Sequence, residues 1–211
     1  MKKSCTTIIE EMRNGILWLC FQRPQARNAL TFEMYDRLAL LCQKIATDGT
    51  VRAVVIHGTG GKAFAAGTDM TLFRNFSKAE DAIKYEHQID LVLSAIEQCP
   101  VPILAAIHGA CTGGGASIAA ACDIRIASEK AFLVPAFGGI GLSGDYGGSW
   151  SLSQLVGPSK AKDIYFSNRR IQAQDALNEG IVNYVVGESD LESFALQKAS
   201  EIAYFSPTAL Q

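Results

Sequence analysis

The sequence has no excess of charge of either sign. Its 19 Lys and Arg residues are balanced by 21 Asp and Glu residues, which gives a formal net charge of -2 over 211 residues. A nucleic-acid-binding domain usually carries a basic stripe, and this sequence has none. It also lacks repeats, biased tracts and linker-like segments. With 48% hydrophobic residues, the chain is expected to form one domain around an apolar core.

The sequence also lacks a pattern that would bind a metal. Its six cysteines are far apart, none form a C-x-x-C pair, and the histidines His57, His87 and His108 do not cluster with them. We therefore expect no metal site and no disulfide framework. Scattered cysteines of this kind favour reduced, buried thiols in a cytoplasmic compartment.

No apolar run is long enough to suggest a membrane segment. The longest candidate, residues 101–121, is interrupted by His108, Thr112 and four glycines. Near the N-terminus, the apolar run 16–21 is too short for a signal peptide and follows Glu10 and Glu11. We therefore expect a cytoplasmic protein without a membrane partner.

The secondary-structure signals alternate between strand and helix, which predicts an α/β fold. Segments rich in Val, Ile or aromatic residues predict strands at 15–21, 52–57, 103–107, 124–127 and 181–186. Apolar residues with helical spacing predict helices at 31–46, 78–98, 116–121, 149–155, 159–166, 173–179 and 190–204. Thr31 is the expected N-cap of the first helix.

Two turns of small residues are candidates for ligand contact. The first, residues 65–69 (AAGTD), follows a predicted strand, and the second, Gly113 to Gly115, opens an Ala-rich helix. Glycines at such turns leave backbone N–H groups available, and a helix N-terminus adds a positive dipole end. These donors suit a developing oxyanion or a phosphate. The alternatives are a tight turn capped by Asp69 and close packing of the helix on a sheet. The dinucleotide-binding glycine pattern is not met.

Two further side chains could carry chemistry. Ser117 lies in Gly115-Ala116-Ser117-Ile118-Ala119, which resembles the nucleophile elbow of serine hydrolases, but nothing marks a histidine as its base. A buried or capping serine is the better interpretation. Asp145 is the single carboxylate in the glycine-rich segment 138–150. Desolvation there would let it act as a base, or it could simply accept backbone hydrogen bonds in a turn.

Taken together, six segments resemble the crotonase superfamily, also called the enoyl-CoA hydratase/isomerase family. They are residues 23–30, 62–69, 102–115, 122–127, 141–148 and 173–182. The resemblance implies a spiral of β-β-α units, assembly as trimers or dimers of trimers, and an acyl-CoA thioester as substrate. Coenzyme A would enter with the substrate, so no other cofactor is implied. The core would cover residues 1–204, and residues 205–211 would begin a truncated C-terminal helical region.

The resemblance also assigns roles to individual residues. Two backbone N–H groups, those of Thr68 and Gly114, would stabilise a thioester enolate. The coenzyme A portion would contact Gln25, Ala26, Ala66 and Asp69. With no basic patch evident, its phosphates would be held by a few local groups such as Arg27, or by a neighbouring subunit.

Departures from the family pattern indicate which reaction to expect. Hydratases of this family carry two glutamates where this chain has Ser117 and Ala136. Asp145 instead lies where the Δ3,Δ2-enoyl-CoA isomerases and the ring-epoxide isomerases carry their acidic base. One carboxylate is enough to move a proton between two carbons. We therefore expect an enoyl-CoA isomerase, with double-bond or ring-epoxide isomerisation both open.

Other functions remain open at this stage. The 4-chlorobenzoyl-CoA dehalogenases have similar spacing, but they pair their Asp with a tryptophan and a histidine where this chain has Phe137 and Asp90. Asp90 is either a solvated helix residue or a second acid near the acyl pocket. The remaining alternatives are a hydratase-like lyase with an atypical acid/base, a non-catalytic acyl-CoA-binding protein, and a serine hydrolase using Ser117.

Overall fold

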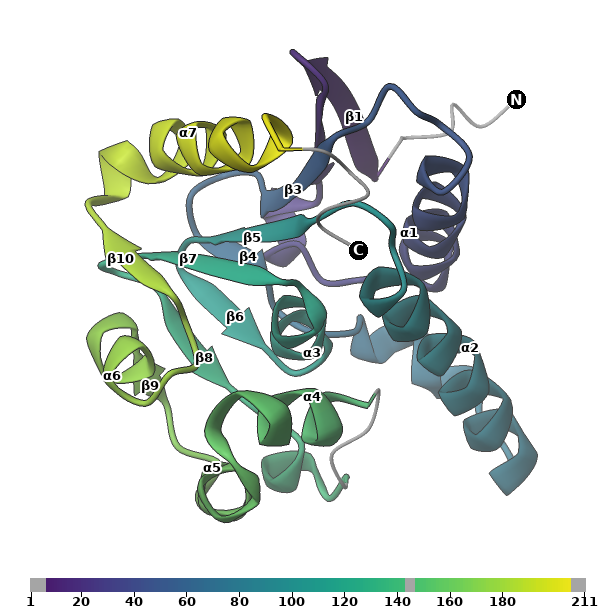
Figure 1. Cartoon of the computed structure of the whole chain (residues 1–211). Helices are drawn as coiled ribbons and strands as arrows, with labels where there is room; N and C mark the ends of the chain where they lie inside the picture. The colour runs from purple at the N-terminus through teal and green to yellow at the C-terminus, as the bar shows by residue number, and fades with distance from the viewer. Residues whose placement is uncertain (1–6, 143–146, 206–211) are drawn as a thin grey trace.

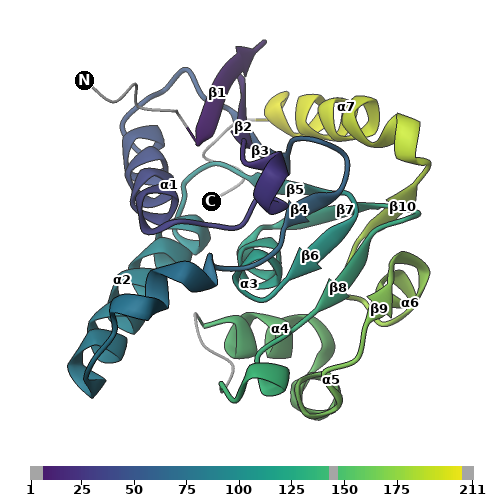
Figure 2. The same cartoon turned by 180° about the vertical axis from the view of Figure 1, so that it is seen from behind.

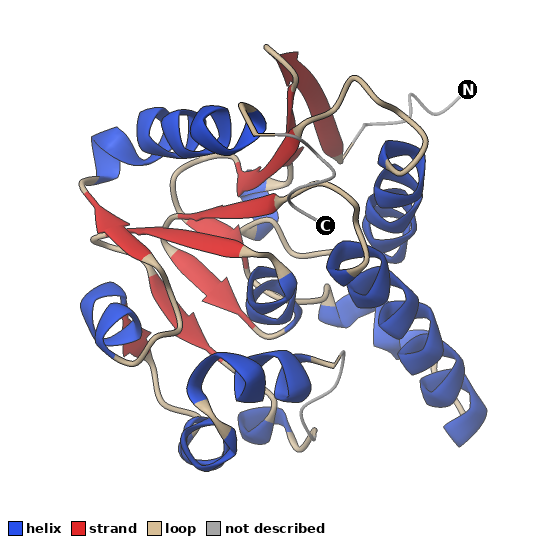
Figure 3. Ribbon diagram, in the orientation of Figure 1, coloured by secondary structure: helices blue, strands red, loops and turns tan. Residues whose placement is uncertain are grey.

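The computed structural model describes residues 7–142 and 147–205, which form two sheets surrounded by helices (Figures 1 and 3). The larger sheet has its strands in the order β1 (Ile8–Arg13), β2 (Ile16–Phe21), β3 (Ala53–Gly58), β5 (Ile103–Ile107), β7 (Ile124–Ser128) and β10 (Tyr184–Val186). β1 pairs with β2 in antiparallel fashion, and the other neighbours are parallel.

The second sheet contains the shorter strands, in the order β4 (Ala63–Ala65), β6 (Ala110–Thr112), β8 (Phe132–Val134) and β9 (Ile171–Gln172). The pairs β3–β4, β5–β6 and β7–β8 each place one strand in each sheet. They lead into the helices α2 (Ala79–Glu97), α3 (Gly114–Ala121) and α4 (Gly148–Val156). This repetition is the expected α/β spiral of β-β-α units, so the predicted fold class is confirmed.

The predicted helices agree closely with those observed. Besides α2, α3 and α4, they are α1 (Phe32–Ile45), α5 (Pro158–Ser167), α6 (Ala173–Asn178) and α7 (Leu191–Ala203). Thr31 caps α1 as expected, because its hydroxyl accepts from the Met34 N–H at 3.3 Å. α3 begins at Gly114, two residues before the predicted start, because the glycine turn itself forms the first helical residues.

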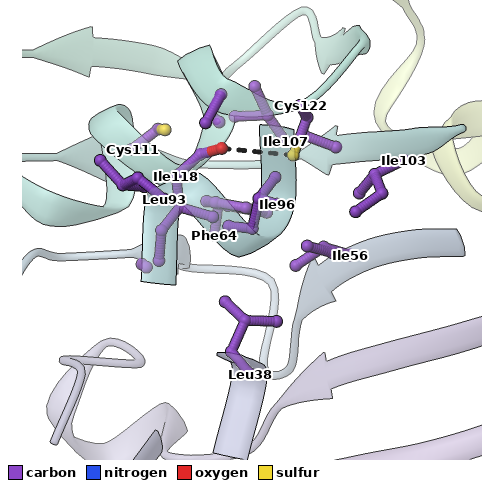
Figure 4. Packing of buried hydrophobic residues seen from close by; sticks show 14 of the residues in the cluster. Leu38, Ile56, Phe64, Leu93, Ile96, Ile103, Ile107, Cys111, Ile118 and Cys122 are labelled. Carbon is purple, nitrogen blue, oxygen red and sulfur yellow. Dashed lines mark hydrogen bonds between the residues drawn. The ribbon is translucent and has the colours of Figure 1, made fainter. Parts of the chain in front are cut away.

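The parallel strands are apolar on both faces because helices or the second sheet cover each side. In β2, for example, Leu17, Leu19 and Phe21 join the main core, while Ile16 and Trp18 lie under α7. Figure 2 shows α7 above β5 and β7 in that view, and α7 contacts β2, β3, β5 and β7. Figure 4 shows the main core, where Ile56, Phe64 and other apolar side chains from both sheets and from the helices meet.

Some strand predictions were wrong. The segment 181–186 is extended only at 184–186, because the N–H groups of Ile181 and Val182 both donate to the Ala176 carbonyl and close the end of α6. The sequence analysis did not predict β1, because it is an edge strand with exposed Glu10 and Glu11. It also did not predict β4, β6, β8 and β9, because each has only two or three residues.

Two further predictions concern a membrane segment and the C-terminal region. No helix within 7–142 and 147–205 is long and apolar enough to cross a membrane. Residues 206–211, where a further helical region was expected to begin, lie outside the described residues.

Candidate functional site

The two small-residue turns lie side by side. They follow β4 and β6, which are parallel neighbours, so the carboxyl ends of both strands meet at one edge of the smaller sheet. Gly67 has a φ of +91°, and a Cβ added to it would lie 3.2 Å from the Thr112 carbonyl oxygen and 3.7 Å from the Gly114 nitrogen. Only glycine fits this close approach at that φ. The tertiary structure therefore brings together two turns that are far apart in the sequence.

The turn after β4 is fixed by the segment that precedes α1. The Ala66 N–H donates to the Arg27 carbonyl at 3.1 Å, and the Leu30 N–H donates to the Gly67 carbonyl at 2.8 Å. The Asp69 N–H then donates back to the Leu30 carbonyl at 2.9 Å. Backbone hydrogen bonds on both sides of Thr68 hold its peptide in one orientation.

Asp69 strengthens the same turn through its side chain. Its carboxylate accepts from the Thr71 hydroxyl at 2.7 Å and forms an ion pair with Arg23 at 2.9 Å. The Thr71 hydroxyl and the Arg23 guanidinium together hold the pKa of Asp69 below its usual value. Asp69 is therefore ionised at neutral pH, and its charge is already matched within the chain.

The second turn places the N-terminus of α3 against β4. Gly113 has a φ of +52°, and the helix begins at Gly114. The first N–H groups of an α-helix have no acceptor within the helix, and the positive end of the helix dipole lies there. Gly115 packs directly on Ala65, because a Cβ added to Gly115 would overlap the Ala65 carbonyl oxygen and lie 2.8 Å from its Cβ.

A pocket of about 200 Å³ opens where these turns meet. Thr68 and Gly114, the two proposed N–H donors, both line it, and so does Ala66. The rest of its wall is apolar or small and consists of Gly67, Met70, Phe73, Gly113, Ala136, Phe137, Ile140 and Leu142. Two backbone donors in a mostly apolar pocket can stabilise a negative oxygen more strongly than they would in water.

Gln25, Ala26 and Arg27 do not line this pocket, although the Arg27 carbonyl accepts from the N–H of Ala66, which does. Gln25 and Arg27 are exposed, and Ala26 is half-buried in the short 3-10 helix Pro24–Ala26. The Ala29 N–H donates to the Ala26 carbonyl at 3.0 Å, which connects this helix to the segment bound by the Ala66–Asp69 turn.

The positions where hydratases carry glutamates both border this region. Ala136 lines the pocket beside Thr68, and its N–H donates to the Asn168 side chain at 2.9 Å. Ser117 is 3% exposed and lines a narrow cavity of about 40 Å³ behind the pocket. Gly113 and Phe137 border both spaces and lie between them. Neither position supplies a carboxylate.

The arrangement does not favour a serine hydrolase. The Ser117 hydroxyl lies 3.5 Å from the Gly113 carbonyl, as in an ordinary helical serine. His57 and His108 line a separate pocket with Trp18, on the α7 side of the larger sheet, and His87 is exposed on α2. Ser117 therefore has no imidazole beside it to act as a base.

The two candidate acids are Asp145 and Asp90. Asp145 lies outside the described residues, but the residues on either side of that segment are at the site. Leu142 lines the pocket of Thr68 and Gly114, and Gly148 lines the cavity of Ser117. Asp90 is exposed on α2 and is absent from the walls of both spaces. Its position agrees with a solvated helix residue.

Two tyrosines that the sequence did not single out hold the Thr68 side chain. The Thr68 hydroxyl is 2.8 Å from the Tyr35 hydroxyl and 3.0 Å from the Tyr85 hydroxyl. Tyr35 comes from α1 and Tyr85 from α2, and both are buried. A tyrosine on a buried helix face needs a partner for its hydroxyl, and that is the signal that could have identified them.

Comparison with known proteins agrees with this fold. Residues 11–211 match the family described as enoyl-CoA hydratase/isomerase, and the chain belongs to that family. A putative enoyl-CoA hydratase/isomerase of Bacillus subtilis is 35% identical over 193 residues, which are 92% of this chain and 74% of the relative.

Relatives whose names state different activities are equally similar to this chain in sequence. A short-chain-enoyl-CoA hydratase of Clostridium acetobutylicum is 34% identical over 97% of this chain and 78% of its own length. A Δ(3,5)-Δ(2,4)-dienoyl-CoA isomerase of Mus musculus is also 34% identical, over 96% of this chain and 65% of its own. Among solved structures, an enoyl-CoA hydratase of Bacillus anthracis superposes with a TM-score of 0.91 at 30% identity, covering 96% of this chain and 78% of the other.

Proposed function

We propose that this enzyme of the enoyl-CoA hydratase/isomerase family is an isomerase of enoyl-CoA thioesters. One observation carries this proposal: both backbone-donor turns line one pocket, and Ser117 and Ala136 border this region. By the family resemblance, these two positions hold the glutamates that activate water in hydratases. Without those carboxylates, addition of water has no evident base. A proton shift needs only one acid/base group, and Asp145 is the candidate.

The proposed reaction proceeds through an enolate. The Asp145 carboxylate removes a proton from the α carbon of a 3-enoyl-CoA, and the electron pair moves onto the thioester oxygen. The N–H groups of Thr68 and Gly114 bind that oxygen, a type of contact worth about 3 kcal/mol per donor in the transition state. Protonated Asp145 then returns the proton at the γ carbon. The product is the 2-enoyl-CoA, and the carboxylate is regenerated.

Recognition of the coenzyme A portion is assigned to the segment before α1 and to the turn after β4. We propose contacts from Gln25, Ala26, Ala66 and Asp69, with exposed Arg27 near the phosphates. Because Arg23 and Thr71 already bind the Asp69 carboxylate, we expect Asp69 to contribute by shaping the turn. Coenzyme A arrives as part of the substrate, so the reaction requires no separate cofactor.

We also propose that the enzyme is cytoplasmic, which the scattered cysteines favour. The family resemblance implies that it assembles as a homotrimer or a dimer of trimers. Light scattering coupled to size-exclusion chromatography gives the mass of the assembly directly. A monomeric mass at the concentrations used for activity assays would contradict the proposed assembly.

Product analysis tests the proposed reaction. The purified enzyme is incubated separately with a straight-chain 3-enoyl-CoA and with the corresponding 2-enoyl-CoA. The products are then separated by chromatography and their masses are measured by mass spectrometry. We expect the 3-enoyl-CoA to give an isomer of unchanged mass. A product heavier by one water from either substrate would instead identify a hydratase, the activity named for the Clostridium relative. Binding of the thioesters without turnover would identify a non-catalytic binding protein.

The hydroxyl contacts to Thr68 lead to a further prediction. Tyr85→Phe removes one of the two hydroxyls that hold the Thr68 side chain, while the ring stays packed among Phe32, Phe73 and Phe76. Loss of one neutral hydrogen bond corresponds to about 1 kcal/mol, so we expect kcat to fall about fivefold with little change in KM. Steady-state kinetics with a 3-enoyl-CoA measure this. Tyr204→Phe is the matched control, since Tyr204 is 89% exposed. Equal kcat values in the two variants would contradict the prediction.

A further inference from the structure

The side chain of Asn28 links three separate parts of the backbone. Its Oδ1 accepts from the Arg23 N–H at 2.9 Å, while its Nδ2 donates to the Thr59 carbonyl at 3.0 Å and to the Ala63 carbonyl at 2.7 Å. One N–H donor and two carbonyl acceptors fit only this orientation of the amide. Asn28 therefore joins the segment before α1 to the loop between β3 and β4 and to the start of β4.

The Asn28 amide fits closely into the space that it occupies. Asn28 is fully buried, with an exposed fraction of 0%. A Cβ added to Gly58 would lie 2.6 Å from the Asn28 Nδ2, so a larger residue at position 58 would displace the amide. The backbone of Asn28 has a φ of +56°, a region that asparagine adopts more readily than most residues with a side chain. Because Asn28 is buried, any effect on ligand binding acts through the segments that it holds.

The segment held in this way is residues 23–27, which the proposed function places against coenzyme A. The Asn28 N–H donates to the Arg23 carbonyl at 2.9 Å, which closes the segment into a compact loop. The Arg23 guanidinium forms an ion pair with Asp69 at 2.9 Å, on the turn that carries Thr68. Asn28 thus fixes where this loop lies relative to the turn with one of the proposed N–H donors.

A second close contact holds the same loop. Gly60, between β3 and β4, has a φ of +83°, and a Cβ added to it would lie 2.6 Å from the Pro24 Cβ. The neighbouring Gly61 has a φ of +66°, but nothing lies within 4 Å of a Cβ added there. Both glycines are exposed and have positive φ angles, and only Gly60 contacts the loop.

We propose that Asn28 is a positioning residue that sets the affinity for the coenzyme A portion of the substrate. This inference rests on the proposed function, because it takes residues 23–27 as part of the coenzyme A site. A loop that is already held in its binding conformation loses little conformational freedom when the ligand binds. Without the amide, the loop must be ordered during binding, and the affinity falls. We expect this effect only for ligands long enough to reach the loop, since the thioester end binds in the Thr68–Gly114 pocket.

Binding measurements with two saturated thioesters test the proposal. One ligand is butyryl-CoA, and the other is S-butyryl-N-acetylcysteamine, which has the same thioester but lacks the nucleotide and most of the pantetheine. In Asn28→Gly, glycine accepts the positive φ and removes the amide. We expect the dissociation constant of butyryl-CoA to rise about tenfold, while that of the short thioester changes by less than about twofold. An equal rise for both ligands, or no rise for butyryl-CoA, would overturn the proposal.

Gly60→Ala reaches the same loop with the Asn28 amide intact, so it decides the outcome if Asn28→Gly does not fold. The added methyl group meets Pro24, and we expect butyryl-CoA to bind at least about threefold more weakly, with no change for the short thioester. Gly61→Ala is the matched control, because it imposes a similar backbone strain without that contact. It should leave both dissociation constants within about twofold of wild type. Equal effects of the two glycine variants would contradict the proposal.

Leu104→Ala controls for a general loss of stability. Leu104 is 0% exposed in the core beneath α7, away from residues 23–27, so this variant is destabilised by a cavity but should bind both thioesters as the wild type does. Wild-type binding separates this inference from the proposed function. Equal affinity of the wild type for both thioesters would overturn coenzyme A recognition together with this inference. A wild-type preference for butyryl-CoA that Asn28→Gly retains would overturn this inference alone.

Discussion

Asp145→Asn is expected to reduce isomerisation of a 3-enoyl-CoA by about 10²- to 10⁴-fold, the usual contribution of a general acid/base. The amide has nearly the same size and can still take part in hydrogen bonds, but it cannot accept the α proton. Binding of the thioester should be retained, because the Thr68 and Gly114 donors and the segments proposed to bind coenzyme A are unchanged. Steady-state kinetics and calorimetric titration with an unreactive acyl-CoA measure the two effects separately.

The matched control for this change is Asp90→Asn. Asp90 is exposed on α2 and absent from the wall of the Thr68–Gly114 pocket, so the same substitution there should leave kcat within about twofold of wild type. A large loss in both variants would indicate that two acids cooperate. Unchanged turnover in Asp145→Asn would remove Asp145 from the reaction, and the isomerase mechanism proposed above would fail with it.

Gly115→Ala is expected to have the second-largest effect, through the contact between α3 and β4. Alanine is normally favoured over glycine in a helix by about 0.5–1 kcal/mol, so in open space this change would stabilise the protein. Here the added Cβ would overlap the Ala65 carbonyl oxygen and lie 2.8 Å from the Ala65 Cβ. Both neighbouring atoms belong to Ala65 in β4, and neither can move away by a change of rotamer, as the end of a long side chain could. We expect overpacking to cost about 1–3 kcal/mol of unfolding free energy.

The same displacement should disturb catalysis. Moving α3 away from β4 changes the separation between Gly114 and Thr68, which line one pocket from these two elements. Misplacing one donor of this kind lowers kcat by about 10²-fold or more. Urea denaturation and steady-state kinetics measure the two losses. Gly49→Ala is the control, because nothing lies within 4 Å of a Cβ added there. Equal stability and turnover in the two variants would contradict the assigned contact.

The sequence predicted those features that depend on residues close to one another along the chain. Helix limits followed from apolar spacing and from the Thr31 cap, and the glycine turns were recognisable as sites with available N–H groups. Short strands such as β4 and β6 were not recognisable, because strands of three residues have no measurable periodicity. They form because they pair with each other at the edge of the smaller sheet, a property of the sheet order rather than of either segment.

For the site, the sequence alone determined the family resemblance, the candidate donors Thr68 and Gly114, and the replacement of two carboxylates by Ser117 and Ala136. Only the tertiary structure decided which residues meet. It placed Gly67 against Gly114, and the Tyr35 and Tyr85 hydroxyls on Thr68. The physical reason is that local sequence governs backbone conformation, whereas contacts between distant residues depend on how strands pair and how helices pack upon them.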